Sequence, residues 1–302
     1  MKVAVIMGGI SSEREIYLNS GNEVFNNLDR DKYEVIKVVI DSKEDVFTKI
    51  TDDIDFAFLA LHGKFGEDGS IQSILEGKNI PYSGCGPLSS GLCMDKNMSK
   101  KILAYSNIPT AKWVVTNSVD KIDYKTIESF GYPVFIKPNS GGSSVATFCI
   151  KNREEIKYAV EKVLEVYEYA IIEEYIPGGE YTSFVLNGEV YPTISIKTNS
   201  EFFDYNSKYE QNGAIEEVVY LEEYLQNQIN EISKTCWDIF YCKAYVRIDM
   251  IIYDGVPYVI ELNTLPGLTK TSLIPKSAAE VGLSFSDLLD KIIEYSLKPS
   301  SK

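Results

Sequence analysis

Apolar runs of strand length alternate with an amphipathic segment at the start of the chain. KVAVIMGG has the length and apolar content of a buried strand, and Ser12 and Glu15 form a capping-box signal for a helix after it. YEVIKVVI and DFAFLALHG indicate two more strands. This β-α-β order predicts a parallel sheet in the first part of the chain.

The order of elements changes where IPTAKWVV begins. PVFIKP and SVATFCI flank a glycine-serine turn, and NREEIKYAVEKVLEV has the pattern of a capped amphipathic helix. YAIIEEYI adds a strand. These elements predict a small α+β domain over roughly residues 96–180.

Two hairpins dominate the last third of the chain. YTSFVL and EVYPTISI flank the turn signal Asn187-Gly188, and VRIDMII and VIELN flank a second turn. Between the hairpins lie a polar stretch at 199–213, of a length that is usually functional or disordered, and a helix at 221–239. We expect a last helix from about Ser286.

Polar side chains alternate with apolar ones on both strands of the second hairpin. Arg247 and Asp249 share one face of VRIDMII, and Glu261 and Asn263 share one face of VIELN. Carboxylate and amide oxygens without His or Cys form a hard oxygen site, which suits Mg²⁺ or Mn²⁺ bound together with phosphate oxygens. A structural network of arginine and carboxylates on a half-exposed sheet is the alternative at this point.

The length of the turn decides whether these polar residues meet. A two-residue turn at Asp254-Gly255 would put Asp249 and Glu261 on opposite faces of the hairpin. A three-residue loop that begins at Tyr253 puts all the polar residues on one face. We predict the three-residue loop, with Gly255 at its position of positive φ.

Length and charge exclude several classes of protein. A chain of 302 residues is long enough for two or three domains, and its 44% hydrophobic and 25% charged residues are ordinary for a globular protein. The net charge of −14 argues against a nucleic-acid partner. The N-terminal apolar stretch is too short for a signal peptide and no segment has transmembrane length, so we expect a cytoplasmic protein without a membrane partner. The five cysteines form no CxxC pair and are expected to be reduced, buried thiols.

A glycine-rich segment and three lysines would indicate a phosphate site only if they lay close together in the folded protein. PNSGGSSV, at residues 138–145, could bring backbone N–H groups and hydroxyls close to a phosphate, or it could be a flexible turn. Lys96, Lys137 and Lys208 are dispersed along the chain, and such lysines are usually solvated unless they meet at an anion.

Other polar residues at the ends of strands and helices have both a functional and a plain interpretation. Glu173 and Glu174 could accept hydrogen bonds from a ribose or an adenine, or they could be solvated charges. Glu13 could receive a substrate ammonium, or it could interact only with a helix dipole. His62 follows a strand, where α/β sheets place ligands, or it caps a loop.

Together these motifs resemble those of a known family. GGISSEREIYLNSG, LHGKFGEDGSIQ, MDKNMSK, FIKPNSGGSSV, FFDYNSKY, VRID and ELNTLPGLTKTSLIPKSA follow one another as in the D-alanine:D-alanine ligases of the ATP-grasp superfamily, and the resemblance extends from end to end. It implies an ATP-grasp fold of the α/β class, α+β in the ATP-binding part. Its domains would be a Rossmann-like parallel-sheet domain at residues 1–95, a central domain at 96–180, and a C-terminal ATP, Mg²⁺ and catalytic domain at 181–302.

The resemblance also implies a role for each matching residue. The ligands of two Mg²⁺ ions, which Mn²⁺ could replace, would be Asp249, Glu261 and Asn263. The contacts to ATP would come from Lys96, Lys137, Ser143, Ser144, Glu173, Glu174, Ile176, Glu180 and Lys208. The catalytic groups would be Glu13, Ser143, Tyr209, Arg247 and Gly267. Further substrate contacts would come from His62, Lys208, Ser272 and Leu273.

The implied reaction joins two D-alanine molecules through an acyl phosphate, with ATP as the cosubstrate, and its product would enter peptidoglycan synthesis. A D-alanine:D-lactate or D-alanine:D-serine ligase of the same fold is the first alternative, and a non-catalytic nucleotide sensor is the second. Because members of the family are commonly dimers, the resemblance also implies a homodimer.

Overall fold

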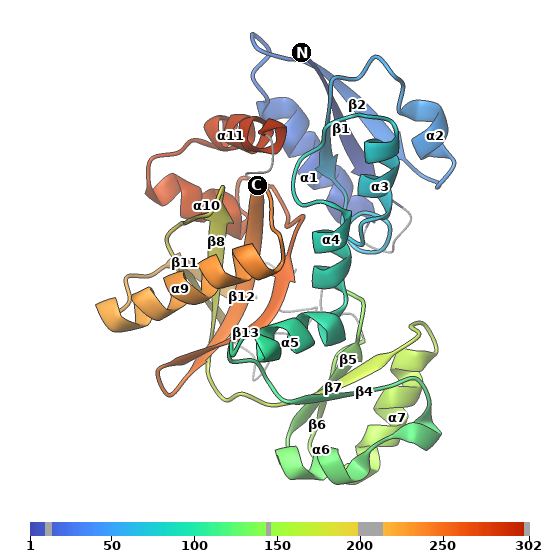
Figure 1. The fold of residues 1–302 in the computed structure, drawn as a ribbon, viewed down its shortest axis with the longest axis vertical. Helices are drawn as coiled ribbons and strands as arrows, with labels where there is room; N and C mark the ends of the chain where they lie inside the picture. The colour runs from blue at the N-terminus through green and yellow to red at the C-terminus, as the bar shows by residue number, and fades with distance from the viewer. Residues whose placement is uncertain (10–13, 143–145, 199–213, 299–302) are drawn as a thin grey trace.

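The computed structural model describes residues 1–9, 14–142, 146–198 and 214–298, whose strands form three sheets arranged along the long axis of the molecule (Figure 1). Within these ranges no helix is both long enough and apolar enough to cross a membrane.

The first sheet is parallel, and two of its three strands, β1 (Lys2–Gly8) and β3 (Phe56–Ala60), are buried along almost their whole length. β1 lies between β2 (Glu34–Ile40) and β3. Helices α1 (Arg14–Asn27) and α2 (Asp45–Lys49) connect the strands. Strands covered on both faces need apolar residues at every position, which explains the continuous apolar runs of β1 and β3. The predicted parallel β-α-β arrangement is confirmed.

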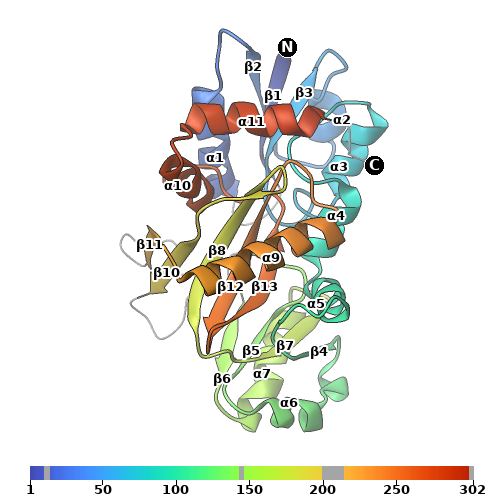
Figure 2. The ribbon, with the colours of Figure 1, turned by 60° about the vertical axis from the view of Figure 1, so that its left-hand side comes forward.

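The last two helices of the chain complete the core of this first sheet. They are α10 (Leu273–Glu280) and α11 (Phe285–Leu297), and α11 packs beside α1 (Figures 1 and 2). Leu289 of α11 belongs to the same buried cluster as Val5 of β1. α11 begins at the predicted place. α10 was not predicted, because Pro275 and the polar residues after it obscure its apolar face.

Three helices lead from the first sheet to the second: α3 (Ser70–Gly77), α4 (Pro87–Met94) and α5 (Lys96–Tyr105). Asp95 caps α5 by accepting a hydrogen bond of 2.9 Å from the Met98 N–H. α5 lies between the second and third sheets in both views, so its side chains can reach both (Figures 1 and 2).

The second sheet is antiparallel and carries its helices on one face (Figure 1). Its strands follow the order β4 (Trp113–Thr116), β7 (Ala170–Glu174), β5 (Val134–Pro138) and β6 (Phe148–Ile150). The helices are a short 3₁₀ turn (Val119–Lys121), α6 (Tyr124–Phe130) and α7 (Arg153–Leu164). Asn152 caps α7 as predicted, because its side chain accepts a 3.3 Å hydrogen bond from the Glu155 N–H.

The third sheet is antiparallel and is covered on one face by α9 (Glu223–Ile239) (Figure 2). Its order is β11 (Ala214–Val218), β10 (Ile194–Thr198), β8 (Gly179–Leu186), β12 (Tyr245–Tyr253) and β13 (Val256–Asn263), with β9 (Glu189–Val190) paired to β8. The predicted turn at Asn187-Gly188 joins β8 to β9, with φ angles of 50° and 81°.

The turn between β12 and β13 differs from the predicted one. Tyr253 pairs with Val256, so the turn has two residues, Asp254 and Gly255, with φ angles of 49° and 73°. The predicted three-residue loop is therefore wrong. A two-residue turn alone would put Asp249 and Glu261 on opposite faces. They share a face because the register shifts next to Asp249 and leaves Ile260 as a β-bulge.

As a result of this bulge, the polar residues of the two strands face one another. Asp249 is opposite Glu261, and Arg247 is opposite Asn263. The single polar face predicted for the hairpin is present, although its cause lies in the strand and not in the turn.

The cysteines carry free thiols, as expected. Four of the five are buried, and Cys149 is partly exposed.

Candidate active site

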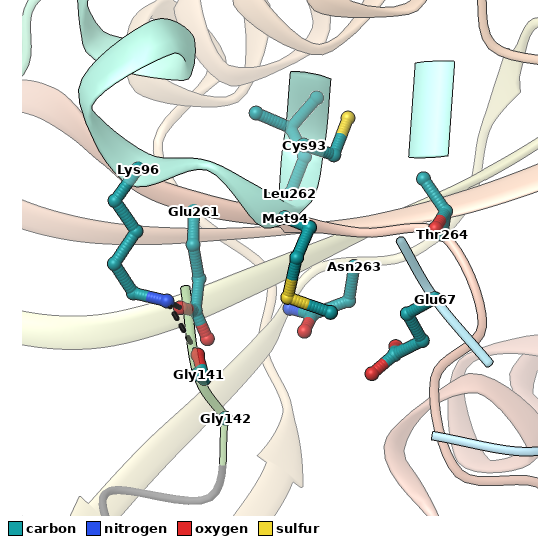
Figure 3. A pocket seen from close by; sticks show the side chains of 10 residues that line it. All are labelled: Glu67, Cys93, Met94, Lys96, Gly141, Gly142, Glu261, Leu262, Asn263 and Thr264. Atoms are coloured by element: carbon teal, nitrogen blue, oxygen red, sulfur yellow. Dashed lines mark hydrogen bonds and ion pairs between the residues drawn. The ribbon is translucent and has the colours of Figure 1, made fainter. Parts of the chain in front are cut away.

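A polar pocket opens where the end of β13 meets the start of α5 and the glycine-rich segment after β5. Its lining includes Glu67, Lys96, Gly141, Glu261 and Asn263 (Figure 3). These residues are far apart in sequence and come from all three regions of the chain. The pocket therefore gathers several of the motifs that were singled out separately in the sequence.

Lys96 links the glycine-rich segment to the acidic strand. Its ammonium donates a 2.7 Å hydrogen bond to the Gly141 carbonyl and lies 3.2 Å from Oε2 of Glu261 (Figure 3). The backbone of Lys96 donates to the Asn139 carbonyl at 3.0 Å, and Asn139 Oδ1 accepts from the next N–H of α5 at 2.9 Å. Lys96 is a buried cation held at an anion, and not the solvated lysine that was the alternative.

Arg247 and Asp249 form a bidentate ion pair on the polar face of β12. Nε of Arg247 is 2.9 Å from Oδ1 and its Nη2 is 2.7 Å from Oδ2 of the carboxylate. Thr182 Oγ1 and the Asn263 amide also donate to this carboxylate, at 2.6 and 2.9 Å. Burial acts to lower the pKa of Arg247, but the Asp249 carboxylate outweighs it and raises that pKa above its usual value.

The oxygen groups at this end of the hairpin fit a hard divalent cation. The Asn263 amide nitrogen donates to Asp249, which leaves its carbonyl oxygen for a cation. Among the described residues no three His, Cys, Asp or Glu side chains gather into a metal site. A cation held by Asp249, Glu261 and Asn263 would complete its shell with ligand oxygens and water, as Mg²⁺ does at phosphates.

A second charged cluster lies on the face of the second sheet that points to α5. Glu173 is buried, with its Oε2 2.6 Å from the Lys137 ammonium and its Oε1 2.9 Å from the ammonium of Lys100. Burial acts to raise the pKa of Glu173, but the lysines lower it to about 2. Neither Glu173 nor Lys137 is thus a solvated surface charge.

Sequence reasoning missed Lys100, although MDKNMSK contains it. A signal was present, because Lys100 follows Lys96 by four residues and therefore lies on the same face of α5. Its neighbour Lys101 is exposed, so the pair of lysines looks like an ordinary solvated helix surface.

The cluster around Glu173 predicts a dependence of stability on pH. With a folded-state pKa of about 2 and an ordinary value of 4.5, ionised Glu173 stabilises the fold fully above pH 4.5 and loses this effect as the pH falls from 4.5 to about 2. The loss is of the order of 3 kcal/mol. Urea unfolding at pH 6 and pH 3.5 is expected to give a smaller difference in unfolding free energy for Glu173→Gln than for the wild type, and equal differences would contradict the prediction.

The other predicted nucleotide contacts follow Glu173 along the chain. Glu174 is held at Lys112, whose backbone N–H donates to Oε1 at 2.8 Å and whose ammonium is 3.1 Å from Oε2. Ile176 is buried, and its carbonyl accepts a 2.9 Å hydrogen bond from the Gly178 N–H. Glu180 is the second residue of strand β8 and lies opposite Ile251. These residues thus lie close together in sequence, from the end of β7 to the start of β8.

His62 and Glu67 lie in the loop that follows β3. Nδ1 of His62 is 3.8 Å from Oε1 of Glu67, and the Gly63 N–H donates to Oε2 of Glu67 at 2.6 Å. Glu67 also lines the pocket, which brings this loop to the same region as Glu261 (Figure 3). The position of His62 after a parallel strand agrees with the place where α/β sheets bind ligands.

Gly267 and Ser272 lie between β13 and α10, and Leu273 follows them. Ser272 Oγ accepts a 3.1 Å hydrogen bond from the Thr269 N–H, and Leu273 is the first residue of α10. A side chain added at Gly267 would begin 3.5 Å from Ser272 Oγ, so these two residues are neighbours. Five of the predicted site residues, Glu13, Ser143, Ser144, Lys208 and Tyr209, lie outside the described residues.

The sequence matches one family along most of its length. The family model for the C-terminus of D-Ala D-Ala ligase matches residues 101–294, and the model for its N-terminus matches 2–52 and 43–85. A D-alanine–D-alanine ligase of Clostridium botulinum is 57% identical over 298 residues, which cover 99% of both chains. One of Clostridium perfringens is 55% identical over the same length, again with 99% of both chains covered.

Solved structures agree with these matches. The D-alanine–D-alanine ligase of Bacillus anthracis complexed with ATP has a TM-score of 0.90 and 44% identity, with 98% of this chain and 97% of that chain covered. The D-Ala:D-Ser ligase VanG of Enterococcus faecalis has a TM-score of 0.85 and 31% identity, with 98% and 99% covered. Both the predicted ATP-grasp fold and the resemblance seen in the motifs are confirmed: the chain belongs to the D-alanine–D-alanine ligase family.

Proposed function

We propose that the protein joins two molecules of D-alanine into D-alanyl-D-alanine, with ATP converted to ADP and phosphate, and that the dipeptide serves peptidoglycan synthesis. The full-length identity to the Clostridium ligases supports the reaction. The geometric observation that carries it is the pocket in which Lys96 and Glu261 pair beside Asn263 and Glu67. Such a pocket offers a cation and acidic oxygens to a metal-bound phosphate and a substrate.

ATP is the proposed cosubstrate, as in the Bacillus anthracis complex. The phosphates would contact Lys96, Lys137, Ser143, Ser144 and Lys208, and the adenosine would contact Glu173, Glu174, Ile176 and Glu180. The buried state of Lys96 and the small exposed fraction of Lys137, 15% of its side chain, support this assignment, because a lysine withdrawn from water is stabilised by an anion.

Asp249, Glu261 and Asn263 are the proposed ligands for two Mg²⁺ ions, or for Mn²⁺ in their place. When bound, the metal supplies positive charge that reduces repulsion between a phosphate and an attacking carboxylate. The oxygen-only donor set described above supports this choice over softer metals.

The residues of the chain orient the two amino acids. Glu13 would receive the ammonium of the first D-alanine, and His62 would lie near its carboxylate, which attacks the γ-phosphate to form an acyl phosphate. Ser143 and Tyr209 would help to hold this substrate. The amine of the second D-alanine then attacks the acyl carbon and displaces phosphate.

The second step needs stabilisation of a tetrahedral oxyanion. Arg247 and the Gly267 N–H are the proposed donors, while Ser272 and the Leu273 N–H would bind the carboxylate of the second D-alanine. The bidentate contact with Asp249 fixes the guanidinium before substrate arrives, which is the preorganisation that this kind of catalysis requires.

A D-alanine:D-serine or D-alanine:D-lactate ligase is the second candidate, because VanG, a D-Ala:D-Ser ligase, shares the fold. The higher identity to D-alanine–D-alanine ligases, 57% against 31%, supports D-alanine as the second substrate.

Phosphate release from ATP and Mg²⁺ tests the proposal, with D-alanine, L-alanine, or D-alanine plus D-serine or D-lactate supplied in parallel and products identified by mass spectrometry. We expect release that depends on D-alanine and yields the dipeptide. A mixed product with D-serine or D-lactate in preference to the dipeptide would favour the second candidate. Absence of release under every condition would favour a nucleotide sensor.

The division into domains at 95/96 and 180/181 is also a proposal, and it is supported by the succession of the three sheets along the chain. The second limit falls just inside β8 of the third sheet, which begins at Gly179. A homodimer and a cytoplasmic location complete it. Five free thiols agree with a reducing compartment in which ATP is abundant.

A further inference from the structure

Lys100 is the most deeply buried charged side chain of the described residues, and the proposed reaction gives it no role. Its side chain is 1% exposed. The ammonium donates to Thr110 Oγ1 at 2.9 Å and to the Ala111 carbonyl at 3.2 Å. A buried lysine is costly unless it is paired, so its presence here requires a partner of opposite charge.

That partner is Glu173, and the contact is a close ion pair. The Lys100 ammonium is 2.9 Å from Oε1 of Glu173, yet Oε1 accepts no aligned hydrogen bond from any residue in the described ranges. Two N–H groups of the Lys100 ammonium donate to Thr110 and Ala111. Lys100 thus neutralises Glu173 while it is itself held in place by other groups.

Glu173 has a second lysine on its other oxygen. Lys137 is 2.6 Å from Oε2, and its side chain is 15% exposed, against 1% for Lys100. The cluster therefore holds two cations for one carboxylate, and only the more exposed cation can turn toward a ligand. Lys137 lies on the same face of the second sheet as Glu173, since Phe135 is opposite Glu173 and Lys137 is two residues further along β5.

The anchor of Lys100 connects the two sheets on either side of α5. Thr110 Oγ1, which accepts from Lys100, donates in turn to the carbonyl of Val259 in β13 at 2.8 Å. The ammonium of Lys100 is therefore linked to the third sheet as well as to the second, through contacts that do not involve Lys137.

We propose that Lys100 is a positioning residue for nucleotide binding: it balances the charge of Glu173, so that Lys137 can leave this carboxylate for a nucleotide phosphate. In the absence of Lys100, release of Lys137 would leave a buried carboxylate without a cation, and Lys137 would stay bound to Glu173. The inference rests on the proposed contact between Lys137 and the phosphates of ATP.

Steady-state phosphate release tests the role of Lys100, with ATP varied at saturating D-alanine. The test variant is Lys100→Met, which removes the charge and keeps an unbranched side chain one atom shorter, and the matched control is Lys101→Met, at the exposed neighbour on the same helix. We expect Lys100→Met to raise the KM for ATP by about tenfold or more, a loss of transition-state binding near 1.4 kcal/mol. The kcat at saturating ATP and the KM for D-alanine should change less than about threefold, and Lys101→Met should match the wild type.

A double-variant cycle separates this role from a merely structural one. In a Glu173→Gln background Lys137 is no longer held by a carboxylate, so the further change Lys100→Met is expected to alter the KM for ATP less than about twofold. An equal increase in both backgrounds would overturn the proposal, as would a KM for ATP in Lys100→Met equal to that of Lys101→Met.

A Lys100→Met variant that does not fold and a protein that lacks the proposed activity each call for a different measurement. If Lys100→Met does not fold, Thr110→Val removes one anchor of the ammonium, and it should raise the KM for ATP with a smaller effect on kcat; an unchanged KM would then overturn the proposal. A wild-type protein without D-alanine-dependent phosphate release would instead refute the proposed function, and ATP binding measured by calorimetry would still report the effect of Lys100.

Discussion

Replacing Glu261 with glutamine is expected to lower D-alanine-dependent phosphate release by about 1,000-fold or more. Glu261 is the one carboxylate that lines the pocket on β13, and it pairs with Lys96 at 3.2 Å. Its loss removes a proposed metal ligand and leaves Lys96 without its acidic partner. Metal catalysis contributes several kcal/mol to such reactions, and each 1.36 kcal/mol is worth a factor of ten in rate.

The kcat at saturating Mg²⁺ measures this effect, and titration with Mn²⁺ followed by electron paramagnetic resonance measures cation binding directly. Glu217→Gln is the matched control, because Glu217 lies on the edge strand β11 with an exposed side chain 3.6 Å from the Lys197 ammonium. The control should retain at least half of the wild-type rate. A rate for Glu261→Gln within tenfold of the wild type would contradict the assignment of this carboxylate to the metal.

Replacing Arg247 with lysine is expected to lower kcat by about 100- to 1,000-fold, the usual effect of removing one oxyanion donor. Lysine keeps the positive charge but has a single ammonium. It cannot hold Asp249 through two parallel hydrogen bonds and still present a donor to an oxyanion. Because the charge beside Asp249 is retained, the unfolding temperature should fall by only a few degrees.

Kinetics and thermal unfolding of the same preparations separate these effects. Arg153→Lys provides the control, because Arg153 of α7 also pairs with a carboxylate, that of Glu128 in α6, but both side chains are exposed. Its kcat should equal that of the wild type. Full activity of Arg247→Lys would refute the oxyanion role, and a lower kcat supports that role only if thermal unfolding shows that the variant is folded.

The motifs of the sequence predicted most of the fold because they carry strong local signals. β1 and β3 are continuous apolar runs, and the Asn187-Gly188 turn and the Asn152 cap depend only on neighbouring residues. The family resemblance added the ATP-grasp fold, which no local pattern can supply.

The β12–β13 hairpin shows where a local rule fails. Asp254-Gly255 gives the two-residue turn that its sequence favours, yet the face of Glu261 is set by a bulge at Ile260. No residue type marks this bulge, since Ile260 is an ordinary strand residue. Its position follows from pairing with β12, which is a tertiary contact.

Lys100 shows a second limit. Sequence alone cannot distinguish it from exposed Lys101, because the difference depends on Glu173 and Thr110, which belong to other elements. The spacing from Lys96 was the only local indication.

The packing of α10 and α11 beside the first sheet has a consequence for synthesis of the protein. A ribosome releases β1, α1 and β3 first, but part of the apolar surface that covers them comes from Ile274, Leu289 and Ile293 at the other end of the chain. The nascent N-terminal segment must therefore remain incompletely covered until translation is almost finished. During that interval its exposed apolar face is a binding surface for cellular chaperones, and loss of the last two helices would make this state permanent.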